Sequence, residues 1–176
     1  MFKKILIGLL LLIAVFCAYV AMLPSDYRIE RSLKIDGKPD QVFAQVNDLR
    51  KFNEWSPWAK LDPNSKAEFS GAEQGEGAAF SWAGNSEVGK GKMTIIESSP
   101  DERIAMKMDF KEPMEDTATV EFLFKPDGES TDVTWAIFGQ DSFMEKAICV
   151  FLDRDKMVGD MFNKGLANLK ASVEQP

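Results

Sequence analysis

The chain has 176 residues, of which 45% are hydrophobic and 28% charged, a composition that is typical of a folded protein and argues against disorder. Acidic side chains outnumber basic ones by 28 to 21, and no basic stripe offsets the net charge of −7, which argues against nucleic-acid binding. The absence of histidine excludes Ser-His-Asp and Cys-His catalysis and the commonest zinc sites.

The first predicted element, residues 1–23, is a membrane-spanning helix that anchors the protein. Residues 5–23 carry no charged side chain, and a helix of this length extends about 28 Å, close to the thickness of a bilayer's hydrocarbon core. A cleaved signal peptide is the alternative, but the apolar run is long for one and no A-x-A-like cleavage site precedes Pro24. We therefore expect residues 5–23 to cross the membrane once.

The charges on either side of this segment bear on its orientation. Lys3 and Lys4 favour a cytoplasmic N-terminus, although Arg28, Arg31 and Lys34 follow closely on the other side and weaken the bias. A short tail with a large downstream domain usually inserts with its N-terminus in the cytoplasm. We expect the domain on the extracytoplasmic side, the periplasm in a Gram-negative bacterium, and the cytoplasmic side remains the alternative.

A short linker, residues 24–27, is predicted to lead into a single domain that covers residues 28–172. Large apolar residues alternate with polar ones over residues 27–35, which predicts a strand. A helix is predicted over residues 39–46, because proline suits the first helical position and three apolar residues share one face. A second short helix or turn is expected over residues 49–54.

The middle of the chain consists of alternating runs separated by glycine-rich turns, which predicts consecutive strands with one face available for burial. The clearest of these strands alternates methionine, isoleucine and phenylalanine with charged residues. A Lys-Pro-Asp-Gly turn precedes the last strand. The predicted strands are residues 77–83, 87–96, 103–110, 118–124 and 131–139.

The chain is predicted to end in helices. Ser142 and Glu145 fit a capping box, and a second amphipathic stretch follows Asp153. The expected fold class is α+β, with a curved antiparallel sheet of about six to seven strands, two short helices after the first strand, and a long C-terminal helix over the sheet. If the sheet is strongly curved, the space between helix and sheet is a cavity.

Several segments together resemble a known pattern. They are residues 31–35, 39–43, 53–58, 75–77 with Trp82, 131–135 and 165–170. Over roughly residues 28–172 the chain resembles the START-like, helix-grip superfamily of the polyketide-cyclase and SRPBCC group. The resemblance implies a deep ligand cavity between a seven-stranded curved sheet and the C-terminal helix. It carries no agreed catalytic residue onto this chain, because that superfamily includes lipid carriers, hormone receptors and cyclases.

Aromatic and methionine side chains are the candidate lining of this cavity, and packing in an ordinary core is the alternative for each of them. One carboxylate, Glu87, joins them because it shares strand parity with Met93 and can point inward. In apolar surroundings its pKa would rise, so it could act as an acid, a base or a ligand anchor, and a turn position facing water is the alternative. The candidates are Trp55, Trp58, Phe80, Trp82, Glu87, Phe110, Trp135, Phe151 and Met157.

Three functions fit these features. The first is a membrane-tethered module that binds a hydrophobic small molecule or lipid. The second is a protein-interaction module whose core is packed shut, and the third is a polyketide cyclase- or dehydratase-like enzyme that uses carboxylate acid–base chemistry. No pair of nucleophile and base is visible in the sequence, so no catalytic residue, metal or cofactor is predicted, and the binding module is preferred.

Overall fold

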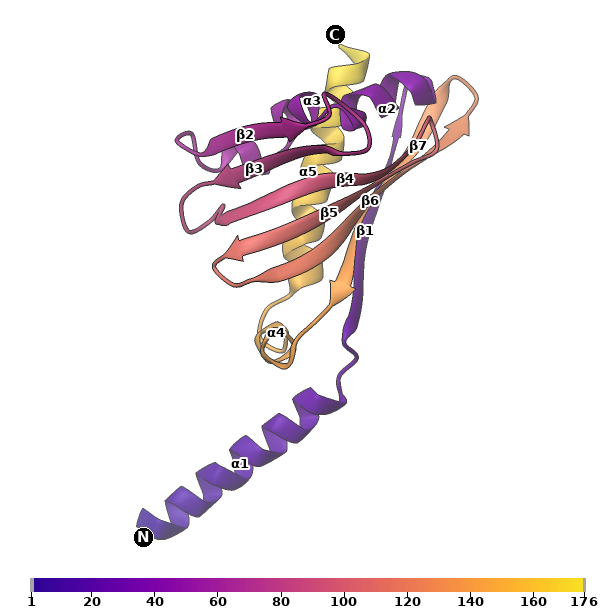
Figure 1. Ribbon diagram of the computed structural model, residues 1–176. Coiled ribbons are helices and arrows are strands. Elements are labelled where there is room, and N and C mark those ends of the chain that lie inside the picture. The colour runs from indigo at the N-terminus through magenta and orange to yellow at the C-terminus, as the bar shows by residue number, and fades with distance from the viewer. Residues whose placement is uncertain (1, 176) are drawn as a thin grey trace.

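The computed structural model describes residues 2–175 and places seven antiparallel strands in one sheet, in the order β1-β7-β6-β5-β4-β3-β2. The strands are β1 (Asp26–Ile35), β2 (Lys66–Gly71), β3 (Ala78–Ala83), β4 (Lys90–Ser99), β5 (Arg103–Glu112), β6 (Asp116–Asp127) and β7 (Ser130–Gln140). The helices are α1 (Phe2–Met22), α2 (Pro39–Asn47), α3 (Leu49–Trp55), a 3₁₀ turn η1 (Trp58–Lys60), α4 (Phe143–Cys149) and α5 (Arg154–Glu174). Figure 1 shows α5 running along one face of the sheet and α1 projecting away from the domain.

The predicted α+β fold class is confirmed, and the differences from the prediction lie at strand ends and at one edge. Strand β4 begins at Lys90, three residues later than predicted, because residues 85–89 form a turn in which Asn85 Oδ1 accepts from the Glu87 N–H at 2.9 Å. Strand β2 was not predicted. It is an edge strand whose only large apolar residue is Phe69, so its sequence shows no hydrophobic alternation.

Helix α1 is the one helix among residues 2–175 that is long and apolar enough to cross a membrane. A signal sequence near an N-terminus has the same character, so length and composition do not separate the two interpretations. The helix ends at Met22, and strand β1 begins at Asp26, directly opposite Gln140 of β7. Only three residues therefore connect the apolar helix with the sheet.

Local sequence signals fix the helix starts. Pro39 occupies the first turn of α2, where its missing N–H costs nothing, and Gln41 Oε1 accepts from the Lys38 N–H at 3.0 Å. The predicted capping box of α4 is confirmed, because Ser142 Oγ accepts from the Glu145 N–H and the Glu145 carboxylate accepts from the Ser142 N–H. These caps satisfy N–H groups that have no partner within the helix.

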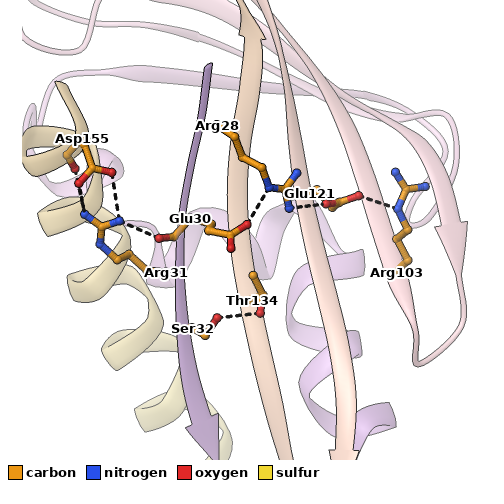
Figure 2. Close-up of polar contacts among 8 residues, drawn as sticks. All are labelled: Arg28, Glu30, Arg31, Ser32, Arg103, Glu121, Thr134 and Asp155. Carbon is orange, nitrogen blue, oxygen red and sulfur yellow. Dashed lines mark hydrogen bonds and ion pairs between the residues drawn. The ribbon is translucent and has the colours of Figure 1, made fainter. Parts of the chain in front are cut away.

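The core fills the space between the sheet and helices α2, α3 and α5. Alternation along the strands turns the apolar side chains of β5 and β6 inward, and Ile104, Met106 and Phe122 are fully buried. Helix α5 packs chiefly along β1, where Arg31 Nη2 pairs with Asp155 Oδ2 at 2.8 Å (Figure 2). The interior is therefore closed by the C-terminal helix on the side of β1.

An ion-pair network covers the outer face of the sheet, with Glu121 at its centre (Figure 2). The two carboxylate oxygens of Glu121 accept hydrogen bonds from Arg28 at 2.9 Å and from Arg103 at 2.8 Å. Arg28 also pairs with Glu30, and Arg103 also pairs with Glu97. Burial raises the pKa of the Glu121 carboxyl, but the hydrogen bonds from both arginines outweigh burial and hold the pKa below its ordinary value of 4.5. The network links strands β1, β6, β5 and β4.

The Glu121→Gln variant is expected to be about 1 kcal/mol less stable at neutral pH, because it removes a charge from two charge-assisted hydrogen bonds whose arginines are partly exposed. A carboxyl whose pKa is lower in the folded state stabilises the protein above its unfolded-state pKa, and this stabilisation is lost as the pH falls through the folded-state pKa. Urea unfolding at neutral pH and below pH 4.5 should therefore show a difference between variant and parent that shrinks in acid. Glu30→Gln, the same change at an exposed partner of Arg28, is the control and should leave stability nearly unchanged. Equal effects of the two variants would contradict a central role for Glu121.

Candidate functional site

Four of the predicted cavity residues meet in one aromatic cluster between the sheet and α5. Trp135 of β7 is at its centre and stacks on Phe162 of α5, with ring centroids 4.3 Å apart and planes 14° apart. Trp55 and Trp58 approach Trp135 edge-on at 5.5 and 5.6 Å, and Phe80 joins the group through Phe52. Rings at these distances are in van der Waals contact, so the middle of the interface is filled by the protein's own side chains.

Two further predicted residues, Trp82 and Phe110, lie together at the end of the sheet where β3 ends and β4 begins. Their rings meet edge-on at 6.0 Å, and Trp82 is 5.6 Å from Phe80, so they continue the aromatic cluster. Both are only partly buried. Gly91 of β4 makes room for the Trp82 ring, because a Cβ at this position would overlap it. The interior is therefore partly exposed at this end.

The structure does not bring the other three predicted residues to this cluster. Glu87 is exposed in the turn before β4. It lies outside the strand, so it does not point inward with Met93 as expected. Phe151, which is 77% exposed, follows α4, and Met157, which is 60% exposed, lies on the outer side of α5. Apolar spacing at a helical period predicts a common face but neither where the helix ends nor which side that face takes, which explains the positions of Phe151 and Met157.

The indole N–H of Trp135 is buried and finds no hydrogen-bond acceptor among residues 2–175. Two other tryptophans are satisfied, since Trp55 Nε1 donates to the Gln45 carbonyl at 3.0 Å and Trp82 Nε1 donates to the Val88 carbonyl at 3.2 Å. A buried N–H without a partner is rare in folded proteins and costs about 1–3 kcal/mol. The centre of the aromatic cluster thus offers one unused hydrogen-bond donor in otherwise apolar surroundings.

A cluster of polar side chains that the sequence did not predict lies at the same end of the sheet as Trp82. Arg154 of α5 lies over the Tyr27 ring, 3.8 Å from its centroid, and is held by both carboxylate oxygens of Asp141 at 2.6 and 2.8 Å. Burial and the nearby Asp116 carboxylate raise the pKa of Tyr27 to about 12, and burial also raises the pKa of Asp116. The Tyr27 phenol therefore stays protonated at neutral pH and can donate a hydrogen bond.

These polar residues sit singly at element ends, so no local motif marks them in the sequence. The one sequence feature that points to this cluster is Tyr27, which is the one tyrosine outside the apolar N-terminal segment. A surface hollow beside them lies between the start of β1, residues 26–29, and residues 149–155. Within the described part of the chain, no three His, Cys, Asp or Glu side chains gather in a way that could hold a metal ion.

Comparison with known proteins gives the same fold. The family described as polyketide cyclase / dehydrase and lipid transport matches residues 26–174. Among solved structures, protein CV1439 from Chromobacterium violaceum is 15% identical with a TM-score of 0.59, over 87% of this chain and 100% of that one. TTHA0849 from Thermus thermophilus is 16% identical with a TM-score of 0.61, over 84% of this chain and 97% of that one. Mll3558 from Rhizobium loti is 22% identical with a TM-score of 0.57, over 85% of this chain and 96% of that one. Among curated proteins, none matches the chain.

Proposed function

The chain belongs to the polyketide cyclase / dehydrase and lipid transport family, and from this membership we propose that its domain binds a hydrophobic small molecule or lipid between the sheet and α5. We propose further that α1 anchors the domain in a membrane as a single-pass segment, with the domain on the extracytoplasmic side. Hydrophobic molecules partition into membranes, so this anchor would keep the binding site close to its ligand.

The observation that carries the proposal is the unpartnered N–H of Trp135 within an apolar interior. A hydrophobic ligand with one carbonyl or hydroxyl oxygen fits these surroundings once the rings move apart, because its oxygen can accept from Trp135 while its apolar part packs on the surrounding rings. Entry is proposed at the end of the sheet where Trp82, Phe110 and Met108 are only partly buried. Methionine is flexible and adapts to ligands of different shape.

Binding is preferred over catalysis because the carboxylate expected to serve an enzyme, Glu87, lies in an exposed turn. Tyr27 is a donor rather than a base at neutral pH, since its pKa is about 12. An interaction module with a closed core stays the alternative, because the rings around Trp135 already touch one another. A direct measurement of ligand uptake separates this alternative from the proposal.

The test uses residues 24–176, which omit α1. The chain from Chromobacterium violaceum aligns over its whole length with 87% of this chain, which supports independent folding of the domain. A fluorescent fatty acid is first titrated into the domain and then displaced with a long-chain ketone and with the alkane of equal length. We expect the parent to prefer the ketone about fivefold, which corresponds to one hydrogen bond of about 1 kcal/mol. The Trp135→Phe variant should lose this preference.

The measured quantity is the ratio of ketone affinity to alkane affinity, compared between the parent and Trp135→Phe. The smaller ring of the variant affects both ligands alike, so its effect cancels in this ratio. Trp55→Phe is the matched control, since the Trp55 N–H already donates to a backbone carbonyl, and it should keep the preference for the ketone. A domain that takes up no fatty acid, or a Trp135→Phe variant that still prefers the ketone, would overturn the proposed role of Trp135. The first of these outcomes would favour the closed interaction module.

A further inference from the structure

Helix α4 and the residues after it expose an unusual amount of apolar surface. The α4 apolar face consists of Phe143, Met144, Ile148, Phe151 and Leu152, whose exposed fractions range from 38% to 77%. The charged side chains of the same helix turn elsewhere, since Glu145 caps Ser142 and Lys146 is 9% exposed. Water is a poor solvent for a contiguous patch of this kind, which marks a contact with another apolar phase or molecule.

This face continues directly onto α1. The rings of Phe151 and Phe16 lie 5.8 Å apart, Val20 of α1 is completely buried, and Lys146 Nζ donates to the Leu23 carbonyl at 3.0 Å. Phe16 precedes Met22, the last residue of α1, by six residues, which places it about 9 Å along the helix axis from that end. Figure 1 shows α4 at the end of the domain nearest α1.

We propose that residues 143–152 are a second membrane-contacting segment, whose apolar face dips into the lipid layer that α1 crosses. This inference rests on the proposed anchoring of α1. Amphipathic segments that lie in a membrane surface bury their apolar face by about 5–10 Å, which agrees with the depth of Phe16 along α1. Lipid acyl chains are the occupant that fits, because a face continuous with a membrane span meets the same apolar phase as that span.

The charges that frame the segment support this assignment. Asp141 precedes the segment, and Asp153 and Arg154 follow it. The two charged residues inside it are engaged with the protein, since the Glu145 carboxylate accepts from the Ser142 N–H and Lys146 donates to the Leu23 carbonyl. Six uncharged residues, 147–152, therefore separate Lys146 from Asp153. Such an arrangement keeps the charges at headgroup level and only the apolar side chains below it.

The consequence concerns access to the interior. Helix α4 follows the end of β7 at Gln140, which pairs with the start of β1 at Asp26. Trp82 and Phe110 lie at this same end of the sheet, since Trp82 is opposite Gly91 and Gly91 is opposite Phe110. Phe110 is in turn opposite Asp116 at the start of β6, and Thr119 of β6 is opposite Phe138 near the end of β7. A membrane contact through α4 would turn this partly exposed end of the domain towards the lipid.

The experiment uses the full chain in vesicles of phosphatidylethanolamine and phosphatidylglycerol, in a background with Cys17→Ala and Cys149→Ala. Single cysteines from Ile148→Cys or Phe151→Cys are spin-labelled, with Leu10→Cys in α1 as the lipid reference and Glu129→Cys in the β6–β7 turn as the aqueous reference. All four positions are exposed in the isolated chain, so labelling should not disturb the fold, which a thermal melt checks. Power saturation compares collisions with oxygen, which concentrates in lipid, and with a water-soluble nickel chelate.

We expect labels at positions 10, 148 and 151 to collide more with oxygen than with nickel, and the label at position 129 to show the reverse. If position 10 reports lipid while positions 148 and 151 report water, the second contact is overturned and the anchor stands. If position 10 also reports water, the anchor itself fails and the inference falls with it. Dipolar broadening at position 151 that grows with the ratio of protein to lipid would assign the face to a second copy and overturn the lipid contact. The ketone preference of the soluble domain is measured separately, so ligand binding does not depend on any of these outcomes.

Discussion

Replacing Phe162 with alanine is expected to lower the free energy of unfolding by about 3–5 kcal/mol, the usual cost of removing a fully buried phenylalanine ring. Phe162 is 2% exposed, and its ring stacks on Trp135 and meets Trp58 edge-on at 6.0 Å. The variant therefore loses both the apolar burial of the ring and its contacts with two tryptophans.

Urea unfolding of residues 24–176, followed by tryptophan fluorescence and by circular dichroism, measures this change. Phe151→Ala is the matched control, because the same side chain is removed at a position that is 77% exposed, and it should alter stability by less than about 0.5 kcal/mol. If Phe162→Ala also costs less than about 1 kcal/mol, then α5 does not pack on Trp135 as described. In that case the interior would be open rather than filled in the unliganded domain.

A second large effect is expected at Gly165, where α5 lies closest to the sheet. A Cβ at this position would overlap the ring of Trp135 and would press on Pro57 Cδ, 3.2 Å away. The Trp135 ring cannot yield, because it is stacked between Phe162 and Phe122. Gly165→Ala must therefore move α5 away from the sheet, and overpacking of this kind costs about 1–3 kcal/mol.

Gly159 provides the control on the same helix. The atoms nearest to a Cβ there belong to the guanidinium of Arg31, the far end of a flexible side chain, whose exposed ion pair with Asp155 would shift at a cost of about 0–1 kcal/mol. Both alanine variants gain the same helix propensity, about 1 kcal/mol, so the difference between Gly165→Ala and Gly159→Ala compares the clash with Trp135 with the displacement of the exposed Arg31 side chain. Equal unfolding free energies for the two variants in urea would contradict the close approach of α5. Reduced uptake of fatty acid by Gly165→Ala would further indicate that the position of α5 shapes the binding site.

The fold could be predicted from the sequence because its signals are local and repeated. Alternating apolar residues in β5, β6 and β7 identified these strands, and the capping box identified the start of α4. Strand β2 carries one large apolar residue in six and gains its pairing from β3, which no local pattern reveals. The confirmed fold class thus rests on strands that are half-buried, and the missed strand is one that is mostly exposed.

The candidate site could be predicted only in part, because it depends on where elements end and on which face a helix turns. A shift of three residues in the start of β4 moved Glu87 from an expected inward position to an exposed turn. The aromatic residues were identified by type, yet the sequence could not distinguish Trp135, whose N–H lacks a partner, from Trp55, whose N–H donates to a backbone carbonyl. Hydrogen bonds of this kind join residues far apart in the chain, so they become visible only in the folded structure.

The short connection between α1 and the sheet limits how far the domain can travel. Leu23, Pro24 and Ser25 span at most about 10 Å when fully extended, and the Ser25 carbonyl already accepts from the Asp141 N–H at 2.8 Å. Under the proposed anchoring, the domain can neither swing across the gap to an opposing membrane nor leave its own bilayer with cargo. Any ligand it binds must be exchanged with the lipid beneath it or handed to a partner that comes to the same membrane surface.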